Sequence, residues 1–581
     1  MNSIPNLSIT ELSFSGGQTL KLSKRDKLLI VGPNNSGKSQ SIRDIVILQS
    51  EHQGTPIVVT SIKTEKNFDK ISLENYLKEN AALVNGTYHI GAAQVHMNHV
   101  STYSGHEKIY SLSKLFTKQI NAKDRLNICE PQSSIDLTQP KTVPQHVLYD
   151  NSELMDKVSA IFKKAFNKEL AFDYRAGKTI PIHLVEKKDL DHIADRVSNE
   201  YVNLLREFPR LDKQGDGIKS YAGILFETIA HNYDVTMIDE PEAFLHPPQM
   251  RRLGQTLSEE VNGQLIVATH SSDILRGFLE GTKGDLKVIR VRRDNNVNYI
   301  HELDQTIVKE LWSKPNLRYS NALEAIFHEQ VIICEDDSDC RLFNYVADHL
   351  INEHNHIFPD TCFVPTGGKH AIPGIANALR LSGVPVKSIF DFDLISEKNI
   401  LKKTLLAFGC EVEKLDKVLT LWDQINAEIT QKCKVISNED IKKNILEFLE
   451  KTPADKVSKN KIEEFFKQKK PWSHVKDNGI TGLPKGNIRK IFHEFNNELK
   501  ALGIFLIPVG EIENFSAETG LHGPAFVEKF LTERNVEDDD LKSLKDFVFE
   551  VFSSKISNPV LALKETIIGG DKVAVEMANN G

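Results

Sequence analysis

Residues 32–39, Gly-Pro-Asn-Asn-Ser-Gly-Lys-Ser, have the types and spacing of a phosphate-binding loop. Glycine lets backbone N–H groups turn toward phosphate oxygens, and the N-terminus of a following helix adds a partial positive charge. Lys38 is expected to reach the β- and γ-phosphates, and the Ser39 hydroxyl to ligate Mg²⁺. The predicted nucleotide-contacting residues are Gly32, Asn34, Asn35, Ser36, Gly37, Lys38 and Ser39.

A second set of residues could complete a nucleotide site. Residues 234–239 form an apolar run that ends in Asp239-Glu240. Such a pair can deliver one carboxylate to Mg²⁺, here Asp239, and another to the attacking water, here Glu240. A later apolar run, residues 264–269, is followed by His270, whose ring could contact the γ-phosphate. The three segments together predict ATP binding and hydrolysis.

A third set consists only of carboxylates, each at or just after the end of an apolar run. Crowded carboxylates repel one another, so a divalent cation is expected to neutralise them, and oxygen-only ligation favours Mg²⁺ or Mn²⁺ over zinc. Two such ions could clamp a phosphodiester. Glu335 is predicted to act as a ligand or base, and Asp391 as a bridging ligand. The full set is Glu335, Asp339, Asp391, Asp393, Glu511 and Glu513.

The elements that must position these residues alternate between strands and helices, which predicts α/β domains with mostly parallel sheets. Apolar, β-branched runs predict strands, whereas residues 150–210 have helical spacing and predict a helical lobe. Residues 26–50 predict a strand, a glycine loop and a helix. The other predicted strands are 56–63, 234–239, 264–269, a hairpin within 285–304, 330–334, 386–390 and 503–509.

Charge is unevenly distributed along the chain. Segment 401–500 has a local net charge of about +5, and its inner stretch 451–490 is more basic still. It has the character of a helical insertion, and 451–490 could contact a polyanion such as DNA, although a solvated helix face is the simpler alternative. A domain boundary is placed near 310–325.

The whole chain is typical of a multidomain globular protein. It has 581 residues, 72 basic and 80 acidic, for a formal net charge of −8. Its 6 cysteines form no CxxC pair, which argues against a zinc ribbon. So few cysteines over this length also argue against a disulfide framework. The first residues do not resemble a signal peptide, and no apolar run of membrane-spanning length occurs. We therefore expect a cytoplasmic protein without a membrane partner.

The nucleotide-site segments resemble ABC-type ATPases, in particular the soluble DNA-repair branch. "GPNNSGKS", "MIDEPEAFLHP" and "IVATHSSDIL" are similar to their Walker A, Walker B with D-loop, and H-loop. The resemblance implies an ATPase domain over residues 1–315, with a helical lobe at about 150–215, and a homo-oligomer that holds ATP between two heads. The signature loop that one head presents to the ATP of the other would be residues 214–220, with Gly215 and Gly217. The Q-loop glutamine would be Gln49 or Gln53.

The second half resembles a TOPRIM nuclease domain over residues 325–581, with the insertion at about 400–500. The resemblance rests on Glu335, the later Asp391-Phe-Asp393, and residues 366–369, Thr-Gly-Gly-Lys, between them. An ABC-type ATPase fused to TOPRIM resembles the OLD (overcoming lysogenization defect) family of ATP-dependent endonucleases. That family implies a late catalytic lysine, for which the candidates are Lys529, Lys542, Lys545 and Lys564.

The expected function is an ATP-dependent, metal-dependent DNA endonuclease in bacterial anti-phage defence. Related effectors imply a partner system, either a retron's reverse transcriptase with non-coding RNA or, as in Gabija, a helicase. Two alternatives remain open at this stage: a TOPRIM topoisomerase or primase, and an ATP-switched DNA clamp that does not cut.

Overall fold

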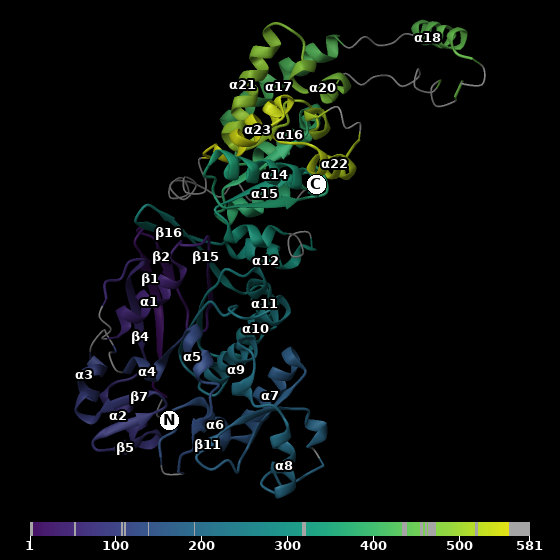
Figure 1. The fold of residues 1–581 in the computed structure, drawn as a ribbon. Coiled ribbons are helices and arrows are strands. Elements are labelled where there is room, and N and C mark those ends of the chain that lie inside the picture. Colours follow the sequence, from purple (N-terminus) through teal and green to yellow (C-terminus); the bar gives the residue numbers. More distant parts are fainter. Residues whose placement is uncertain are drawn as a thin grey trace. The chain divides into compact units, whose positions relative to one another are not determined.

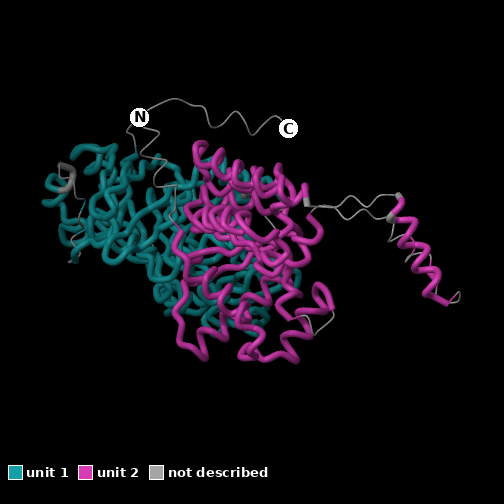
Figure 2. The backbone as a smooth tube through the Cα atoms, turned by 90° about the horizontal axis from the view of Figure 1, so that it is seen from above, with its two compact units in different colours: residues 1–327 teal, residues 328–581 magenta. Residues whose placement is uncertain are grey.

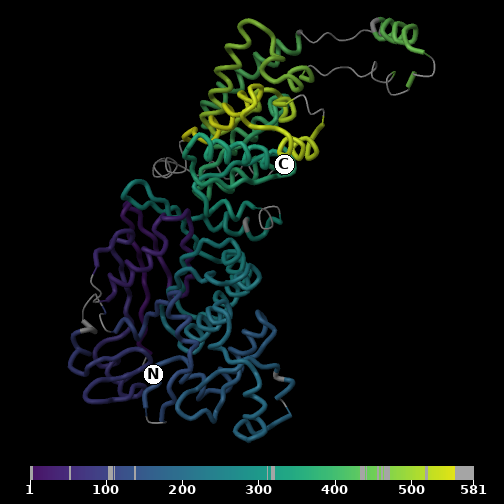
Figure 3. Tube along the Cα trace, viewed as in Figure 1, coloured from purple at the N-terminus to yellow at the C-terminus, as the bar shows by residue number. Residues whose placement is uncertain are grey.

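The structure is a computed structural model that divides the chain into two units, Met1–Phe327 and His328–Gly581 (Figure 2). Figure 3 follows the chain through both units. Each unit is considered by itself below. The structure describes residues 4–50, 54–105, 109, 112–136, 139–190, 192–315, 321–432, 438–453, 457–458, 462, 472–516 and 521–556.

The first unit is built on a six-stranded sheet with the order β16-β15-β3-β14-β13-β8, of which Figure 1 labels β15 and β16. Every neighbouring pair is parallel except the hairpin of β15 and β16. The middle strands are almost entirely buried and apolar, as expected where helices cover both faces of a parallel sheet. The strands are β3 (Lys27–Val31), β8 (Thr117–Ile120), β13 (Val235–Asp239), β14 (Gln264–Ala268), β15 (Lys287–Asp294) and β16 (Val297–Glu302).

Three helices follow the strands that carry the nucleotide motifs. They are α1 (Lys38–Gln49) after β3, α10 (Pro247–Glu260) after β13, and α11 (Ser272–Thr282) after β14. The predicted strand–loop–helix at 26–50, the strands at 234–239 and 264–269, and the hairpin within 285–304 are therefore confirmed.

A second sheet packs on the same core. It has the order β2-β1-β4 and consists of β1 (Leu7–Phe14), β2 (Thr19–Lys21) and β4 (Val59–Lys66). The strand predicted at 56–63 begins three residues later, because the Asp44 carboxylate accepts the backbone N–H groups of Ile57, Val58 and Val59. Those bonds hold the residues before β4 against α1 instead of in the sheet.

Residues 70–127 form smaller elements between β4 and the lobe. A three-stranded antiparallel sheet has the order β5-β6-β7. The elements are α2 (Lys70–Asn80), β5 (Ala82–Val84), β6 (Thr87–Ile90), β7 (Ala93–His96), η1 (Met97–His99), α3 (Val100–Gly105), α4 (Ser113–Phe116) and α5 (Ala122–Asn127).

The lobe is mixed, so the helical prediction for 150–210 is wrong in part. The helices are α6 (Pro144–Asp150), α7 (Ser152–Phe166), α8 (Asn199–Glu207) and α9 (Asp216–Ile229). Between α7 and α8, β10 (Glu169–Phe172) pairs with β12 (Ile182–Val185), and β11 (Thr179–Ile180) pairs with β9 (Gln132–Ser133). The left-handed Asn167 ends α7, and the runs after it are too short for a helical apolar face.

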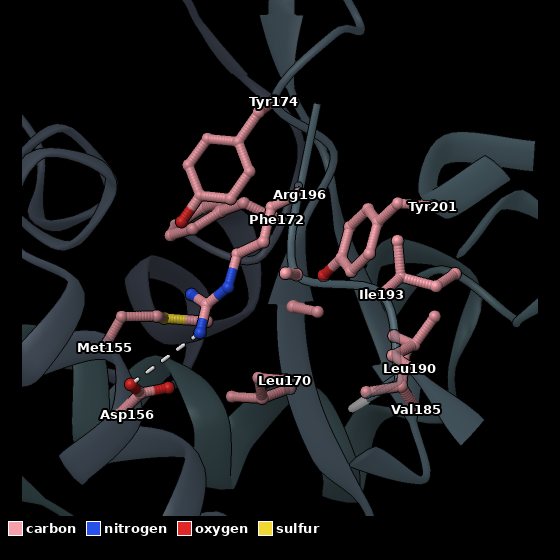
Figure 4. Close-up of a pocket in the computed structure, with 12 residues that line it drawn as sticks. Met155, Asp156, Leu170, Phe172, Tyr174, Val185, Leu190, Ile193, Arg196 and Tyr201 are labelled. Carbon is pink, nitrogen blue, oxygen red and sulfur yellow. Dashed lines mark ion pairs between the residues drawn. The ribbon is translucent and has the colours of Figure 1, made fainter. Parts of the chain in front are cut away.

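The lobe contains a cavity of about 220 Å³, and Tyr201 of α8 is among the residues that line it (Figure 4). Apolar side chains such as Leu170, Phe172 and Val185 line it. Asp156 and Arg196 form an ion pair of 4.0 Å among the residues that line the cavity. The cavity belongs to the lobe's own packing, and neither the phosphate loop nor the Asp239-Glu240 pair lines it.

The second unit has a four-stranded parallel sheet with the order β18-β17-β19-β20. The strands predicted at 330–334 and 386–390 are confirmed, whereas the predicted 503–509 is shorter, because the chain turns after Leu506. Buried side chains of β17, β20, α14, α22 and α23 share one core. The strands are β17 (Gln330–Cys334), β18 (Thr361–Pro365), β19 (Val386–Phe390) and β20 (Ile504–Leu506).

Helices flank this sheet and form the insertion. The flanking helices are α14 (Asp337–His354), α15 (Ile372–Leu381), α22 (Pro524–Glu533) and α23 (Lys542–Ser553). The described part of 400–500 is helical: α16 (Lys398–Ala407), α17 (Val412–Lys432), α18 (Asn438–Lys451), α20 (Ser473–Asn478), η8 (Gly479–Gly482) and α21 (Asn487–Leu502). No helix within the described ranges has both the length and the apolar character needed to cross a membrane.

Candidate functional site

The phosphate loop connects β3 to α1 through left-handed backbone. Gly32 has φ 139° and Gly37 has φ 103°, values that a side chain would strain, which explains glycine at both positions. Asn35, at φ 60°, is a residue type that tolerates this region. The loop thus has the concave backbone and the helix N-terminus that bind phosphate.

Lys38 lies across this loop and is buried. Its Nζ donates hydrogen bonds to the carbonyls of Gly32 and Pro33, each at 2.8 Å. Burial lowers the pKa of Lys38, and the nearby carboxylates Glu242 and Glu240 partly oppose this shift. A phosphate in the loop would compete with the two carbonyls for the ammonium group.

Asp239 ends β13 and fits the role of a magnesium ligand. Ser39 is its hydrogen-bonding partner, which brings the two predicted ligands together. Burial raises the pKa of Asp239, partly opposed by the bond from Ser39. Its Oδ1 atom is buried without a hydrogen-bond partner. An unpartnered buried carboxylate oxygen next to a serine hydroxyl is chemically suited to a Mg²⁺ ion.

Glu240, the predicted water-polarising residue, is exposed and has an unusual backbone. Its φ is 47°, a left-handed conformation that costs a glutamate free energy. Two contacts maintain it: the N–H donates to the Ala268 carbonyl at 2.9 Å, and the carbonyl accepts from Arg125 Nη2 at 2.9 Å. These contacts hold the backbone of Glu240, while the residue itself is exposed.

Arg125 is a residue that sequence reasoning missed. It lies on α5, is fully buried, and also donates to the Asp239 carbonyl at 3.4 Å. Helix α5 approaches α9 so closely that a Cβ on Gly223 would lie 2.0 Å from the Arg125 carbonyl oxygen. No local motif marks this residue, because β8 and β13 become neighbours only in the folded sheet.

Replacing Arg125 with methionine is expected to lower kcat for ATP hydrolysis by about 10- to 100-fold, because a displaced catalytic carboxylate can cost this much. The KM for ATP should change little, since Arg125 does not contact the phosphate loop. Lysine at 125 should restore part of the rate, and Arg252→Met, an exposed change on α10, serves as the control. A raised KM with an unchanged kcat would show that Arg125 acts on binding instead.

Glu242 is the second residue missed by sequence reasoning. It is buried, and burial raises its pKa. Its carboxylate accepts bonds from the Thr269 hydroxyl and the His270 N–H, both at 2.8 Å, and lies 3.1 Å from His270 Nδ1. Glu242, which follows β13, therefore orients the His270 ring, which follows the neighbouring strand β14. The sequence shows the residue only as the last member of the Asp-Glu-Pro-Glu run.

The remaining predicted nucleotide-site residues lie at separate places in the first unit. Gly215 and Gly217 lie at the N-terminus of α9, where a Cβ on Gly217 would approach the Phe244 carbonyl oxygen at 2.5 Å. Gln49 is at the far end of α1 from Ser39, about 15 Å along the helix. This position does not suit a γ-phosphate contact. Gln53 lies outside the described residues.

In the second unit, the first acidic residues meet at the edge where the strands end. Glu335 directly follows β17 and Asp391 directly follows β19, and these strands are adjacent. In the order β18-β17-β19-β20, the direction of chain progression reverses between β17 and β19. Parallel α/β sheets bind ligands at such a topological switch point. The Asp391 N–H donates to Glu335 Oε1 at 3.3 Å. The Gly367 and Gly368 N–H groups both donate to the Glu335 carbonyl at 2.9 Å.

Burial and mutual repulsion shift the titration of these carboxyls. Burial, with the charge of Asp393, raises the pKa of Glu335 to about 7. Burial, with the charge of Glu335, raises the pKa of Asp391 to about 9. Burial also raises the pKa of Asp339 to about 6, although its bond from the Asp336 N–H opposes this. Clustered acids with raised pKa values are typical of a functional site.

Two lysines accompany the acids. Lys369 lies 3.1 Å from Asp393 Oδ2, and Lys476 lies 3.2 Å from Glu511 Oε1 and 3.6 Å from Asp393 Oδ2. Asp393 Oδ1 is buried without a hydrogen-bond partner. This unpartnered oxygen, beside Glu335 and Asp391, fits a divalent-cation ligand set. The sequence alone did not predict that either lysine contacts the acids. The Thr-Gly-Gly-Lys turn was the only sequence signal at Lys369.

The outer acids are less tightly gathered. Glu513 lies in η9 (Ile512–Phe515), where its Oε1 accepts the Gly523 N–H at 2.7 Å. Among the described residues, the six acids do not bring three ligand atoms within 4.8 Å of one another. Metal binding at this site would therefore draw the carboxylates together.

Of the late lysines, Lys529 is on α22 and Lys542 and Lys545 are on α23, whereas Lys564 lies outside the described residues. Much of the basic stretch 451–490, including Lys467, Lys469 and Lys470, also lies outside them.

Replacing Asp391 with asparagine is expected to stabilise the metal-free protein, more at pH 8 than at pH 5. The folded pKa of about 9 exceeds the ordinary value of 3.8, so the stability contributed by the protonated carboxyl is present at low pH and lost as pH rises toward 9. An amide carries no charge and avoids this loss. Thermal unfolding in chelator at both pH values measures the gain in stability, with Asp416→Asn on α17 as control. An equal gain at both pH values would contradict the expectation.

Comparison with known proteins gives a partial match. Residues 28–276 match the family described as "AAA domain, putative AbiEii toxin, Type IV TA system". This segment includes β3, α1, β13 and β14, so the first unit contains an AAA-type, ATP-binding ATPase domain. No curated protein matches the sequence.

Similar solved structures have low scores. The SmcHead bound to the C-winged helix domain of ScpA is 12% identical with a TM-score of 0.32, covering 52% of this chain and 98% of that one. The SMC head domain from Thermotoga maritima is 15% identical, with a TM-score of 0.28 and coverages of 52% and 99%. The ATP-binding cassette of an ABC transporter is 12% identical, with a TM-score of 0.24 and coverages of 54% and 96%. Scores this low support no conclusion about function.

Proposed function

We propose that this protein is an ATP-hydrolysing, divalent-metal-dependent DNA endonuclease that acts in bacterial anti-phage defence. The observation that carries the nuclease proposal is the pair Glu335 and Asp391, partly buried at the ends of adjacent parallel strands, with pKa values raised to about 7 and about 9. Burying two such acids is costly for the fold unless a cation or a reaction uses them.

The residues at this edge have complementary roles in the proposal. Glu335, Asp391 and Asp393 would hold Mg²⁺ or Mn²⁺, which supplies Lewis-acid charge and an acidified water when bound. If Glu335 is not itself a ligand, it would act as the base that accepts a proton from the attacking water. Lys369 and Lys476 both form ion pairs with Asp393 and would attract the phosphodiester backbone.

The first unit would use ATP through the residues described above. Lys38 and the phosphate loop hold the phosphates, Ser39 and Asp239 hold Mg²⁺, and Glu240 polarises the attacking water. The resemblance to ABC-type heads supports a homo-oligomer in which the α9 N-terminus of one copy faces the ATP of another. The separate resemblance carried by Glu335 and Asp391-Phe-Asp393 supports a TOPRIM domain of the OLD family in the second unit.

Incubation of supercoiled plasmid with the purified protein tests the nuclease proposal. Nicked or linear product with Mg²⁺ or Mn²⁺, and none with chelator, is the expected result. Relaxed topoisomers with intact strands would indicate a topoisomerase, and ATP-dependent DNA binding without cleavage would indicate a clamp. A neighbouring gene for a reverse transcriptase or a helicase would support the defence role.

A further inference from the structure

Two histidines and a glutamate converge on the second unit, away from the acidic edge. His349 Nε2 and His354 Nε2 each lie 2.7 Å from the same atom, Glu537 Oε1. Within the described part of the chain, this is the only group that brings three such ligand atoms within 4.8 Å of one another. Two imidazole nitrogens and one carboxylate oxygen form a common ligand set of Zn²⁺.

The three residues come from two separate segments. Both histidines lie in the last two turns of α14, and Glu537 lies between α22 and α23 (Figure 1). Lys545 of α23 donates to the other carboxylate oxygen, Glu537 Oε2, at 2.9 Å. Helix α23 therefore holds the carboxylate with Oε1 toward the two rings, as outer-shell partners orient ligands in metal sites.

The hydrogen-bond geometry suits a cation at this position. Both rings point their Nε2 atoms at one carboxylate oxygen. A metal ion would be bound by these nitrogens of the neutral rings, because metal ligation requires an unprotonated imidazole nitrogen.

The geometry requires only a small adjustment. Tetrahedral zinc with bonds of about 2.0–2.1 Å needs ligand atoms about 3.3 Å apart. Each 2.7 Å contact would have to widen by about 0.6 Å. His354 and Glu537 are exposed and His349 is partly exposed, so the side chains have room to make this change.

We propose that His349, His354 and Glu537 bind one Zn²⁺ ion, with a water molecule as the fourth ligand, and tie the end of α14 to the segment before α23. Imidazole ligands favour Zn²⁺ over Mg²⁺, unlike the all-oxygen acidic edge. The site is also remote from that edge, because α14 has 18 residues and is about 27 Å long. The proposal does not depend on the nuclease function.

Calorimetric titration of the chelator-treated full-length protein with Zn²⁺ tests the proposal. Wild type should bind one more equivalent of Zn²⁺ than His354→Ala or Glu537→Gln, and excess Mg²⁺ should not displace it. His493→Ala, an exposed histidine change on α21, is the matched control and should keep the full stoichiometry. Excess Mg²⁺ in the titration occupies the oxygen-only acidic edge, which separates this site from the proposed nuclease metals.

A second measurement guards against misfolded variants. Zn²⁺ should raise the unfolding temperature of wild type, because a ligand that binds the folded state stabilises it. The His354→Ala protein should unfold at the wild-type temperature in chelator and show a smaller rise with Zn²⁺. Unchanged zinc stoichiometry in the His349→Ala/His354→Ala double variant, or displacement of Zn²⁺ by Mg²⁺, would overturn the proposal.

Discussion

Asp391→Asn protein is expected to cleave DNA in the presence of metal at least about 100-fold more slowly than wild type. Loss of a residue that only supports a metal ligand already costs about 10- to 100-fold in metal affinity or activity, and Asp391 is a proposed ligand itself. The amide keeps the size of the side chain and removes the charge that a metal would bind. Asp391 directly follows β19, where its N–H contacts Glu335, so it occupies the centre of the acidic edge. Glu335→Gln is expected to have a comparable effect.

The measurement is plasmid cleavage with Mg²⁺ or Mn²⁺, alongside ATPase activity of the same preparation. The ATPase rate should remain within about 2-fold of wild type if the two units carry separate chemistries. Asp416→Asn, an exposed carboxylate on α17, is the matched control and should cut DNA normally. Retained metal-dependent cleavage in both Asp391→Asn and Glu335→Gln proteins would contradict the assignment, and cleavage in chelator would contradict metal catalysis.

Lys38→Ala protein is expected to lose ATP turnover by at least about 100-fold, since removing one preorganised positive donor from a charged transition state costs about this much. Glu240→Gln should behave differently: ATP binding persists and hydrolysis slows, because only the attacking water loses its partner. The Lys38 ammonium already lies within the loop, bonded to the Gly32 and Pro33 carbonyls.

Nucleotide binding and steady-state hydrolysis of both proteins check this expectation. Lys70→Ala, an exposed lysine change on α2, is the control and should leave both properties unchanged. Wild-type hydrolysis by the Lys38→Ala protein would defeat the assignment of the phosphate loop. Cleavage assays on the same two variants would then show whether ATP turnover promotes or restrains the nuclease.

Several parts of the fold were predictable because their signals are local. The glycine loop between β3 and α1 follows from eight consecutive residues, and a buried parallel strand is a continuous apolar run wherever it occurs. The ends of β17 and β19 could be located for the same reason, which placed Glu335 and Asp391 at strand termini. The lobe was predicted wrongly because β10 and β12 are too short to show a period of their own.

The sequence by itself predicted the types of residue at the candidate sites: a phosphate loop, an Asp-Glu pair at the end of a strand, and acids after strands. Tertiary structure alone decided which distant residues support them. Arg125 reaches the Asp239-Glu240 carbonyls only because β8 pairs with β13, and Glu242 reaches His270 only because β13 pairs with β14. Similarly, His349 and Glu537 are 188 residues apart and meet only through the packing of α14 near α23. Such contacts leave no local pattern, because long-range packing, and not the neighbouring residues, determines them.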